Sequence, residues 1–289
     1  MKLISYSVNA QQRYGVLLAG GVADLSRRFP HYSSLKEFLE QLPQLTPDVV
    51  ATLTPDYHLE EITFLPPIPN PQKILCVGMN YQAKRLEFNE TDPDPTLFIR
   101  FADSQCGHLA DIIKPAASQE FDYEGELAII IGKRGRNISP TEALAWVAGY
   151  SCYMDGSARD WQHAWFTAGK NWPSTGAFGP WLVTREEIPD PNSLTLTTRL
   201  NGREMQCDNT ANMIHRVPEL IAYISTFCQL TPGDVILTGS PGGVGKKRTP
   251  PVFLQPGDHL EVEIERIGCL QNRVVAERVD NICLAANNS

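Results

Sequence analysis

The strongest constraint on the fold is a run of acids that leads directly into an apolar segment, Phe121-Asp-Tyr-Glu-Gly-Glu-Leu-Ala-Ile-Ile-Ile131. The uninterrupted apolar part, Leu127–Ile131, is typical of a strand covered on both faces. If the whole stretch is one strand, its period of two places Asp122, Glu124 and Glu126 on the same face. Three like charges repel each other, so they are either solvated at the surface or balanced by a divalent cation at the mouth of a core. Oxygen ligands without Cys or His suit Mg²⁺, Mn²⁺ or Ca²⁺ rather than zinc.

A further metal ligand has to come from another strand end, and Asp155 is the candidate. It follows the apolar segment Tyr150–Met154 and opens the turn Asp155-Gly-Ser-Ala-Arg-Asp160. The structural alternative is an Asp that opens a turn before a helix. Arg159 and Asp160 in the same turn have an alternative role as a structural ion pair.

Composition excludes several classes of protein. The chain has 289 residues, and 33 acidic against 25 basic side chains give a net charge of −8. A protein that tracks phosphate backbones is normally basic, so we expect no nucleic-acid partner. No run of roughly 18 apolar residues is present, so we expect no membrane partner. The opening Met1–Ala10 lacks the apolar core of a signal peptide.

The cysteines indicate a reducing compartment. Seven are scattered along the chain without a C-x-x-C pair, which argues against a zinc ribbon and a disulfide framework. They are the residues at 76, 106, 152, 207, 228, 269 and 283. Reduced, mostly buried thiols in a cytoplasmic protein are the simplest interpretation.

Prolines divide the chain into two parts. The segment Leu65–Pro71 contains four prolines in seven residues, which excludes a helix interior and a central strand. We therefore predict a small N-terminal α+β domain over residues 1–64, a linker over 65–71 and a larger body over 72–286. In the first part, Ser33 or Ser34 is expected to cap a helix whose apolar positions begin at Leu35.

The larger body is predicted to be mainly β. Helices are expected after Ser139-Pro140, with Glu142 completing a capping box, and from Val217. Strand patterns are more numerous and cover residues 73–77, 127–131, 150–154, 194–200, 235–237 and 260–264. The fold class is therefore α+β, with strands in the majority.

A glycine-rich stretch, Thr238-Gly-Ser-Pro-Gly-Gly-Val-Gly-Lys-Lys247, superficially resembles a phosphate-binding loop. That motif requires Gly where this chain has Ser240, and Ser or Thr where it has Lys247, which argues against a nucleoside triphosphatase. The remaining interpretations are a plain loop, or a tight turn that offers backbone amides and the Ser240 hydroxyl to a carboxylate ligand.

Several motifs in order resemble the fumarylacetoacetate hydrolase superfamily, in its acylpyruvate hydrolase and 2-hydroxyhepta-2,4-diene-1,7-dioate isomerase branch. The resemblance extends from Lys73 to Val275. The motifs are Gly78-Met-Asn-Tyr81, Asp122-Tyr-Glu-Gly-Glu-Leu-Ala128, Asp155-Gly-Ser-Ala-Arg-Asp-Trp-Gln162, Gly169-Lys170 with Gly179-Pro180, Pro232-Gly-Asp-Val-Ile236 and Gly239-Ser-Pro-Gly-Gly-Val-Gly245. The resemblance implies a mixed β-roll, usually in a homodimer.

The resemblance also implies roles for individual residues. It implies a site for Mg²⁺ or Mn²⁺, with Ca²⁺ as an alternative in crystals, formed by Glu124, Glu126 and Asp155, with Lys170 beside it. The substrate-binding residues that it implies are Tyr81, Arg100, Arg159, Gln162 and Ser240. Trp161, Trp165 and Trp172 either line an apolar pocket or pack in the core.

Hydrolytic relatives activate water with a His-x-x-Glu pair on a mobile lid, and this chain departs from that pattern. Glu87 is retained, but Lys84 stands where the family has His. An unperturbed Lys, with a pKa of about 10.4, is cationic at neutral pH and a poor general base. Three interpretations stay open: Glu87 acts alone, the enzyme catalyses another reaction, or the activity is lost. A fourth is that Lys84 and Glu87 form a solvated ion pair.

The function predicted first is metal-dependent C–C hydrolysis of a 2-oxo or β-diketo acid of the acylpyruvate type, as in aromatic catabolism. A 2-oxo acid can chelate the metal, which polarises the keto group. The alternatives are a lyase or isomerase of the same superfamily, such as an oxaloacetate decarboxylase, a hydratase or a hydroxydienoate isomerase, and a catalytically silent oxo-acid binder.

Overall fold

The structure, a computed structural model, describes residues 1–278. Cys283 and the end of the predicted body at residue 286 lie outside the described residues. Within them, no helix is long and apolar enough to cross a membrane. The six described cysteines are free thiols, and Cys76, Cys106 and Cys152 are buried.

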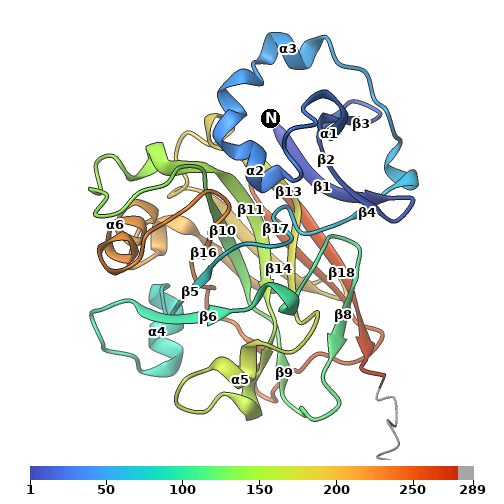
Figure 1. Ribbon diagram of the computed structural model, residues 1–289. Helices are drawn as coiled ribbons and strands as arrows, with labels where there is room; N and C mark the ends of the chain where they lie inside the picture. The colour runs from blue at the N-terminus through green and yellow to red at the C-terminus, as the bar shows by residue number, and fades with distance from the viewer. Residues whose placement is uncertain (279–289) are drawn as a thin grey trace, which may run out of the picture.

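Most of the described chain is arranged in two sheets that pack face to face (Figure 1). The large sheet contains β1 (Lys2–Val8), β2 (Gln11–Leu18), β3 (Gly21–Asp24), β4 (Thr63–Phe64), β5 (Ile74–Gly78), β6 (Thr96–Arg100), β7 (Gln105–Cys106), β10 (Gly125–Ile131), β11 (Val147–Asp155), β13 (Gly176–Thr184) and β16 (Val235–Leu237). The second sheet contains β15 (Arg203–Asn209), β14 (Thr195–Leu200), β17 (His259–Ile264), β18 (Gly268–Ala276) and β8 (Asp111–Lys114). A short pair joins β9 (Phe121–Asp122) to β12 (Ser157–Ala158).

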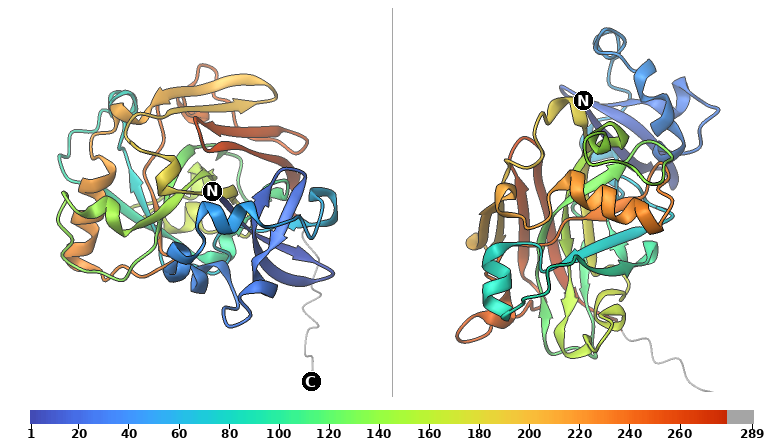
Figure 2. Two further views of the ribbon diagram at one scale, coloured as in Figure 1. Left: turned by 90° about the horizontal axis from the view of Figure 1, so that it is seen from above. Right: turned by 90° about the vertical axis from the view of Figure 1, so that its left-hand side faces the viewer.

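Helices are short and lie around the sheets. The α-helices are α1 (Leu25–Arg28), α2 (Leu35–Phe38), α3 (Pro47–Ala51), α4 (Gln82–Phe88), α5 (Thr167–Lys170) and α6 (Val217–Phe227). The 3₁₀ turns are η1 (Leu39–Gln44), η2 (Leu59–Glu61), η3 (Ala102–Ser104), η4 (Ala143–Trp146), η5 (Arg159–Trp161), η6 (Arg185–Glu187), η7 (Thr210–Asn212) and η8 (Gly245–Lys247). Figure 2 shows the N-terminal elements at one end of the molecule and α4 away from them. The mainly-β α+β fold and mixed β-roll predicted from the sequence are confirmed.

The strand β10 lies at the centre of the core, because both of its faces are covered. Leu127 and Ile129 pack into the cluster shared with the second sheet and α6, whereas Ala128 and Ile130 pack into the cluster that contains α2 and β2. All seven residues of β10 are buried, as the apolar run predicts. A rigid central strand therefore carries the acids that precede and begin it.

The predicted helices differ in outcome. Ser34 caps α2 by accepting a hydrogen bond from the Glu37 amide, and α6 begins at Val217 as expected. The helix predicted after Ser139 is wrong, because the chain forms a turn there and then only the 3₁₀ turn η4. The strand β11 begins at Val147, so the chain becomes extended directly after η4 and the helical segment stops within one turn.

The N-terminal strands are part of the large sheet. Lys2 and Leu3 of β1 pair with Val183 and Leu182 of β13, so β1 to β3 extend the sheet of the body. The proline segment forms neither helix nor strand, as predicted, but it is packed: Ile68 is fully buried. The division at residues 65–71 remains a prediction about folding units.

Candidate metal centre and cavity

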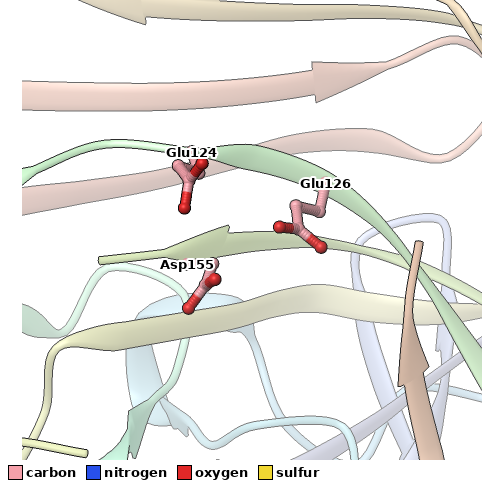
Figure 3. Close-up of side chains that lie close together, drawn as sticks. All are labelled: Glu124, Glu126 and Asp155. Carbon is pink, nitrogen blue, oxygen red and sulfur yellow. The ribbon is translucent and has the colours of Figure 1, made fainter. Parts of the chain in front are cut away.

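Two antiparallel strands bring three carboxylates together at one end of the large sheet. Gly125 of β10 pairs with Met154 of β11, so Glu124 and Asp155 are neighbours, and the Asp155 amide donates to the Glu124 carbonyl at 2.8 Å. Glu126, two residues after Glu124, faces the same space (Figure 3). One oxygen from each carboxylate lies within 4.8 Å of the others, and all three side chains are buried. These are the three residues that the sequence analysis expects as metal ligands, and the structure brings them together.

Asp122 does not join this cluster, so the prediction that three alternating acids share one face is wrong for it. The strand is interrupted between β9 and β10, which turns Asp122 away. Its carboxylate accepts hydrogen bonds from the amides of Gly245 and Lys246, at 2.8 and 3.0 Å, and from Arg159 Nε at 2.9 Å. Asp122 therefore ties the glycine-rich loop and Arg159 to the sheet.

Lys84 is buried on α4 and points at the carboxylates. Its Nζ donates to the Glu124 carboxylate and, at 2.6 Å, to Ser240 Oγ. The interpretation of Lys84 and Glu87 as a solvated ion pair is wrong, because Lys84 is only 3% exposed and its ionic partner is Glu124. The cation therefore sits inside the site, at the position where hydrolytic relatives were expected to hold a base.

Lys170, at the end of α5, bridges two of the three acids. Its Nζ lies 2.6 Å from Glu124 Oε2, 2.5 Å from Asp155 Oδ2 and 2.6 Å from Ser157 Oγ. Burial opposes the charged form, but Asp155 and Glu124 outweigh it and raise the pKa of Lys170. Lys170 is therefore an ammonium at neutral pH.

The electrostatic environments of the two glutamates are opposite. Burial alone would raise the pKa of Glu124, but Arg159, Lys170 and Lys84 outweigh it and hold that pKa well below its usual range. Burial raises the pKa of Glu126 well above its usual range, and repulsion from Asp155 and Glu124 adds to the rise. Environments that push neighbouring pKa values apart are typical of functional sites.

The residues fit a divalent cation. Within residues 1–278, Glu126 forms no ion pair and accepts only the Gly239 amide, at 2.9 Å. A buried carboxylate with no cationic partner is unfavourable unless it is protonated or coordinates a metal. Glu124, Glu126 and Asp155 would hold the cation, and their oxygen donors suit Mg²⁺ or Mn²⁺.

A cavity of about 230 Å³ opens beside the carboxylates. The predicted residues on its wall include Lys84, Arg159, Gln162, Lys170 and Ser240, together with Glu124 and Glu126. Gln162 Nε2 is a buried donor without a hydrogen-bond acceptor in the described chain. Arg159 Nη2 is also buried and makes no hydrogen bond there, although it lies 3.2 Å from Glu124 Oε1 as an ion pair. Two such donors on a cavity wall are suited to the oxygen atoms of an anionic ligand.

Other predicted residues lie elsewhere. Tyr81 is fully buried and does not line the cavity, and Trp165 is 82% exposed. Trp161 and Trp172 stack edge to face, 5.2 Å apart, outside the cavity wall. The apolar wall instead contains Phe88, Phe98 and Phe166. Sequence reasoning missed these three, because a lone Phe carries no signal that separates a pocket from a core.

Glu87 holds the glycine-rich loop. Its Oε1 accepts a hydrogen bond from the Gly243 amide at 2.6 Å, and it does not line the cavity. The loop follows β16, as predicted, but the amides of Gly239 and Gly243 are occupied by the protein's own Glu126 and Glu87. Only the hydroxyl of Ser240 keeps the predicted place beside the cavity.

Arg100 forms an ion pair with Asp155 but does not line the cavity. Its Nη1 lies 2.6 Å from Asp155 Oδ1, and its Nη2 donates to Thr175 Oγ1 at 2.9 Å. Both charged side chains of the pair are fully buried. Neither this pairing nor the contact of Ser157 with Glu124 was foreseen, because the partners are far apart in the sequence.

We expect Arg100→Met to lower the free energy of unfolding by about 3 to 5 kcal/mol, because it leaves the Asp155 charge buried without this partner. Denaturant titration followed by circular dichroism measures the change. The matched control is Arg199→Met, which breaks the partly exposed pair with Glu263 and should cost less than about 1 kcal/mol. Equal losses in both variants would contradict the role of Arg100.

Comparisons with known proteins agree with this site. The family model "Fumarylacetoacetate (FAA) hydrolase C-terminal" matches residues 73–275. The mitochondrial oxaloacetate tautomerase of Bos taurus is 45% identical over 267 residues, covering 89% of this chain and 84% of the relative. The solved fumarylacetoacetate hydrolase of Exiguobacterium antarcticum is 36% identical with a TM-score of 0.85, covering 96% of this chain and all of that one. Maleylpyruvate hydrolase from Sphingobium, solved with manganese(II) and pyruvate, is 26% identical with a TM-score of 0.82 at the same coverage.

These findings overturn one expectation and support others. The cytoplasmic location is wrong, because the similar tautomerases of Bos taurus, Homo sapiens and Rattus norvegicus are mitochondrial. The named relatives include an oxaloacetate tautomerase and a maleylpyruvate hydrolase that was solved with manganese(II). The buried acidic triad of this chain has the chemistry of a divalent metal site. The chain belongs to the fumarylacetoacetate hydrolase family.

Proposed function

We propose that this protein is a divalent-metal-dependent tautomerase of a 2-oxo dicarboxylic acid of the oxaloacetate class, with Mg²⁺ or Mn²⁺ as the metal. The observation that carries the proposal is the cationic Lys84 on the cavity wall, bound to Glu124 and Ser240. An ammonium can deliver a proton to carbon but cannot activate water as a base. The similarity to an oxaloacetate tautomerase supports the same reaction.

The cavity offers a place for each end of such an acid. Arg159 Nη2 and Gln162 Nε2, which make no hydrogen bond in the described chain, are suited to a carboxylate. Ser240 Oγ, held 3.1 Å from Glu124 Oε1, orients the other end beside the acids. The divalent cation, when bound, stabilises the negative charge that develops on the keto oxygen.

Tautomerisation moves one proton and one double bond. In the enol-to-keto direction, the hydroxyl on carbon 2 loses a proton, carbon 3 gains one, and the double bond moves from carbon to oxygen. We assign proton delivery at carbon 3 to the Lys84 ammonium. The hydroxyl proton returns to Lys84 Nζ through the Ser240 hydroxyl, 2.6 Å away. The reaction consumes no water and cleaves no carbon–carbon bond.

The test follows the ultraviolet absorbance of enol-oxaloacetate after mixing with purified protein and Mg²⁺. We expect a protein-dependent loss of the enol band without release of pyruvate. Lys84→Met should lower the rate by about 10²- to 10⁴-fold, the usual contribution of a general acid or base. Pyruvate release at the same rate as enol loss would instead show a decarboxylase, and an unchanged rate in Lys84→Met would contradict the assignment.

Hydrolysis of an acylpyruvate is the second candidate, and the retained Glu87 and the fold shared with maleylpyruvate hydrolase favour it. It requires Glu87 to leave the Gly243 amide and face the cavity. The matching assay is release of pyruvate from maleylpyruvate, which should depend on Glu87 and not on Lys84. A role in aromatic catabolism belongs to this candidate alone. We propose a homodimer for either activity, as the family resemblance implies.

A further inference from the structure

We propose that the site binds its divalent cation and a dianionic oxo acid cooperatively, and that Lys84 is the residue that couples the two. The identity of the dianion as a substrate rests on the proposed function. The coupling itself is a property of the charges in the site and concerns binding, not turnover.

The charges that surround the cavity and its carboxylates are balanced. Four acids and four bases that are at least nine-tenths buried meet here, so with every carboxylate ionised their sum is zero. They are Asp122, Glu124, Glu126 and Asp155 on one side and Lys84, Arg100, Arg159 and Lys170 on the other. A divalent cation adds two positive charges to a poorly solvated region. A monoanion compensates half of them, and a dianion compensates both.

The four bases differ in how many hydrogen-bond and ion-pair partners hold them in place. Arg100 donates to four acceptors besides Asp155, which belong to Ser104, Gly156 and Thr175. Lys170 bridges two carboxylates and Ser157. Arg159 is tied to Asp122 at 2.9 Å. These three bases are held by several partners or by an acid outside the cation's ligand set.

Of the four bases, Lys84 is the one that its ion-pair partner needs least. Within residues 1–278, its only acidic partner is Glu124. Glu124 also pairs with Lys170 and Arg159, so its charge is compensated without Lys84. A cation on Glu124 repels the Lys84 ammonium. The side chain lines the cavity next to Ser240, so it can turn from Glu124 to a carboxylate of the ligand without movement of the backbone. Metal entry thus creates the cationic contact that the dianion uses.

The test measures Mn²⁺ affinity by electron paramagnetic resonance of free Mn²⁺, with and without saturating oxalate as the dianion and glyoxylate as a monoanion. Oxalate chelates Mn²⁺ in water as well, so free Mn²⁺ is corrected for that complex. In the unmodified protein we expect oxalate to raise Mn²⁺ affinity by about tenfold more than glyoxylate does, within the usual range of coupling. In Lys84→Met, Mn²⁺ alone should bind more tightly and the advantage of oxalate should fall to about one-third or less of its original value.

Two further variants isolate the charge of Lys84. Lys84→Arg keeps the charge and should keep most of the coupling, which also provides a readout if Lys84→Met does not fold. Lys247→Met is the matched control: Lys247 is exposed, and its Nζ lies 4.3 Å from the Phe88 ring on the cavity wall. It removes one nearby charge that contacts no carboxylate, so coupling should be unchanged.

Equal coupling in the unmodified protein and in Lys84→Met would overturn the inference, as would equal effects of Lys84→Met and Lys247→Met. The outcome is independent of the proposed reaction. A protein that tautomerises oxaloacetate without Lys84-dependent coupling refutes only the inference, whereas coupling without turnover refutes only the proposed function.

Discussion

Glu126→Gln is expected to weaken metal binding strongly and, at the same time, to stabilise the metal-free protein. Gln keeps the shape and the hydrogen bond from Gly239 but removes the one carboxylate of the cluster that has no cationic partner in the described chain. Mn²⁺ affinity should fall by at least about 100-fold, beyond the usual effect of a residue that only supports a ligand. Turnover should fall on the order of 10³-fold, since Lewis-acid stabilisation supplies several kcal/mol and each 1.4 kcal/mol is tenfold.

The stability of the same variant has a defined pH dependence. Because the pKa of Glu126 is raised, the folded protein holds this proton more tightly than the unfolded chain, whose Glu has a pKa of about 4.3. The metal-free protein therefore loses stability as the pH rises from about 4.3 through the raised pKa. Glu126→Gln should lack that part of the loss, which thermal unfolding in a chelator at several pH values measures.

The control for both measurements is Glu120→Gln, since the ion pair of Glu120 in the described part of the chain is a surface pair with Lys246. It should change neither Mn²⁺ affinity nor the pH profile. A Glu126→Gln protein that still binds Mn²⁺ with the original affinity would remove Glu126 from the ligand set. A variant that loses stability at neutral pH in the chelator would contradict the repulsion argument.

Lys170→Met is expected to separate metal binding from turnover. Lys170 is an ammonium placed against Glu124 and Asp155, so its removal leaves more negative charge for a cation. Mn²⁺ affinity should therefore be unchanged or higher. Turnover should nevertheless fall on the order of 10³-fold, because a positioned cation on the cavity wall is lost.

Lys73→Met provides the comparison for Lys170→Met. Lys73 pairs with the buried Asp234 at 2.8 Å and does not line the cavity, so its loss changes stability without changing kcat. Isothermal titration with Mn²⁺ and steady-state kinetics give the two numbers needed. If Lys170→Met loses Mn²⁺ affinity and kcat in the same proportion, Lys170 organises the metal site and has no separate part in turnover.

Local patterns predict the elements that position the site. The apolar run at Leu127–Ile131 predicts β10, and the Pro and Glu after Val217 predict the start of α6, because both signals lie within one element. The three carboxylates can also be predicted from the sequence, since two lie at the start of one buried strand and the third ends another. The family resemblance added Lys170, which no local pattern indicates.

The partners of these residues are beyond local patterns. Lys84 meets Glu124 across 40 positions of sequence and Arg100 meets Asp155 across 55, so only the packed sheet brings them together. The two-residue period of a strand predicts that Asp122 and Glu124 share one face, but the break between β9 and β10 separates them. Spacing along a strand describes a face only while the strand continues, and the sequence shows no marker of the break.

The pairing of β1 with β13 bears on how this protein can be shortened or joined to others. A chain cut at the proline segment would expose the backbone edge of β13, a strand whose side chains are nearly all buried. Unpaired edges of this kind recruit strands from other molecules. The N-terminal part thus acts as an edge protector for the catalytic sheet, and the natural sites for fusion are the surface loops, not the prolines.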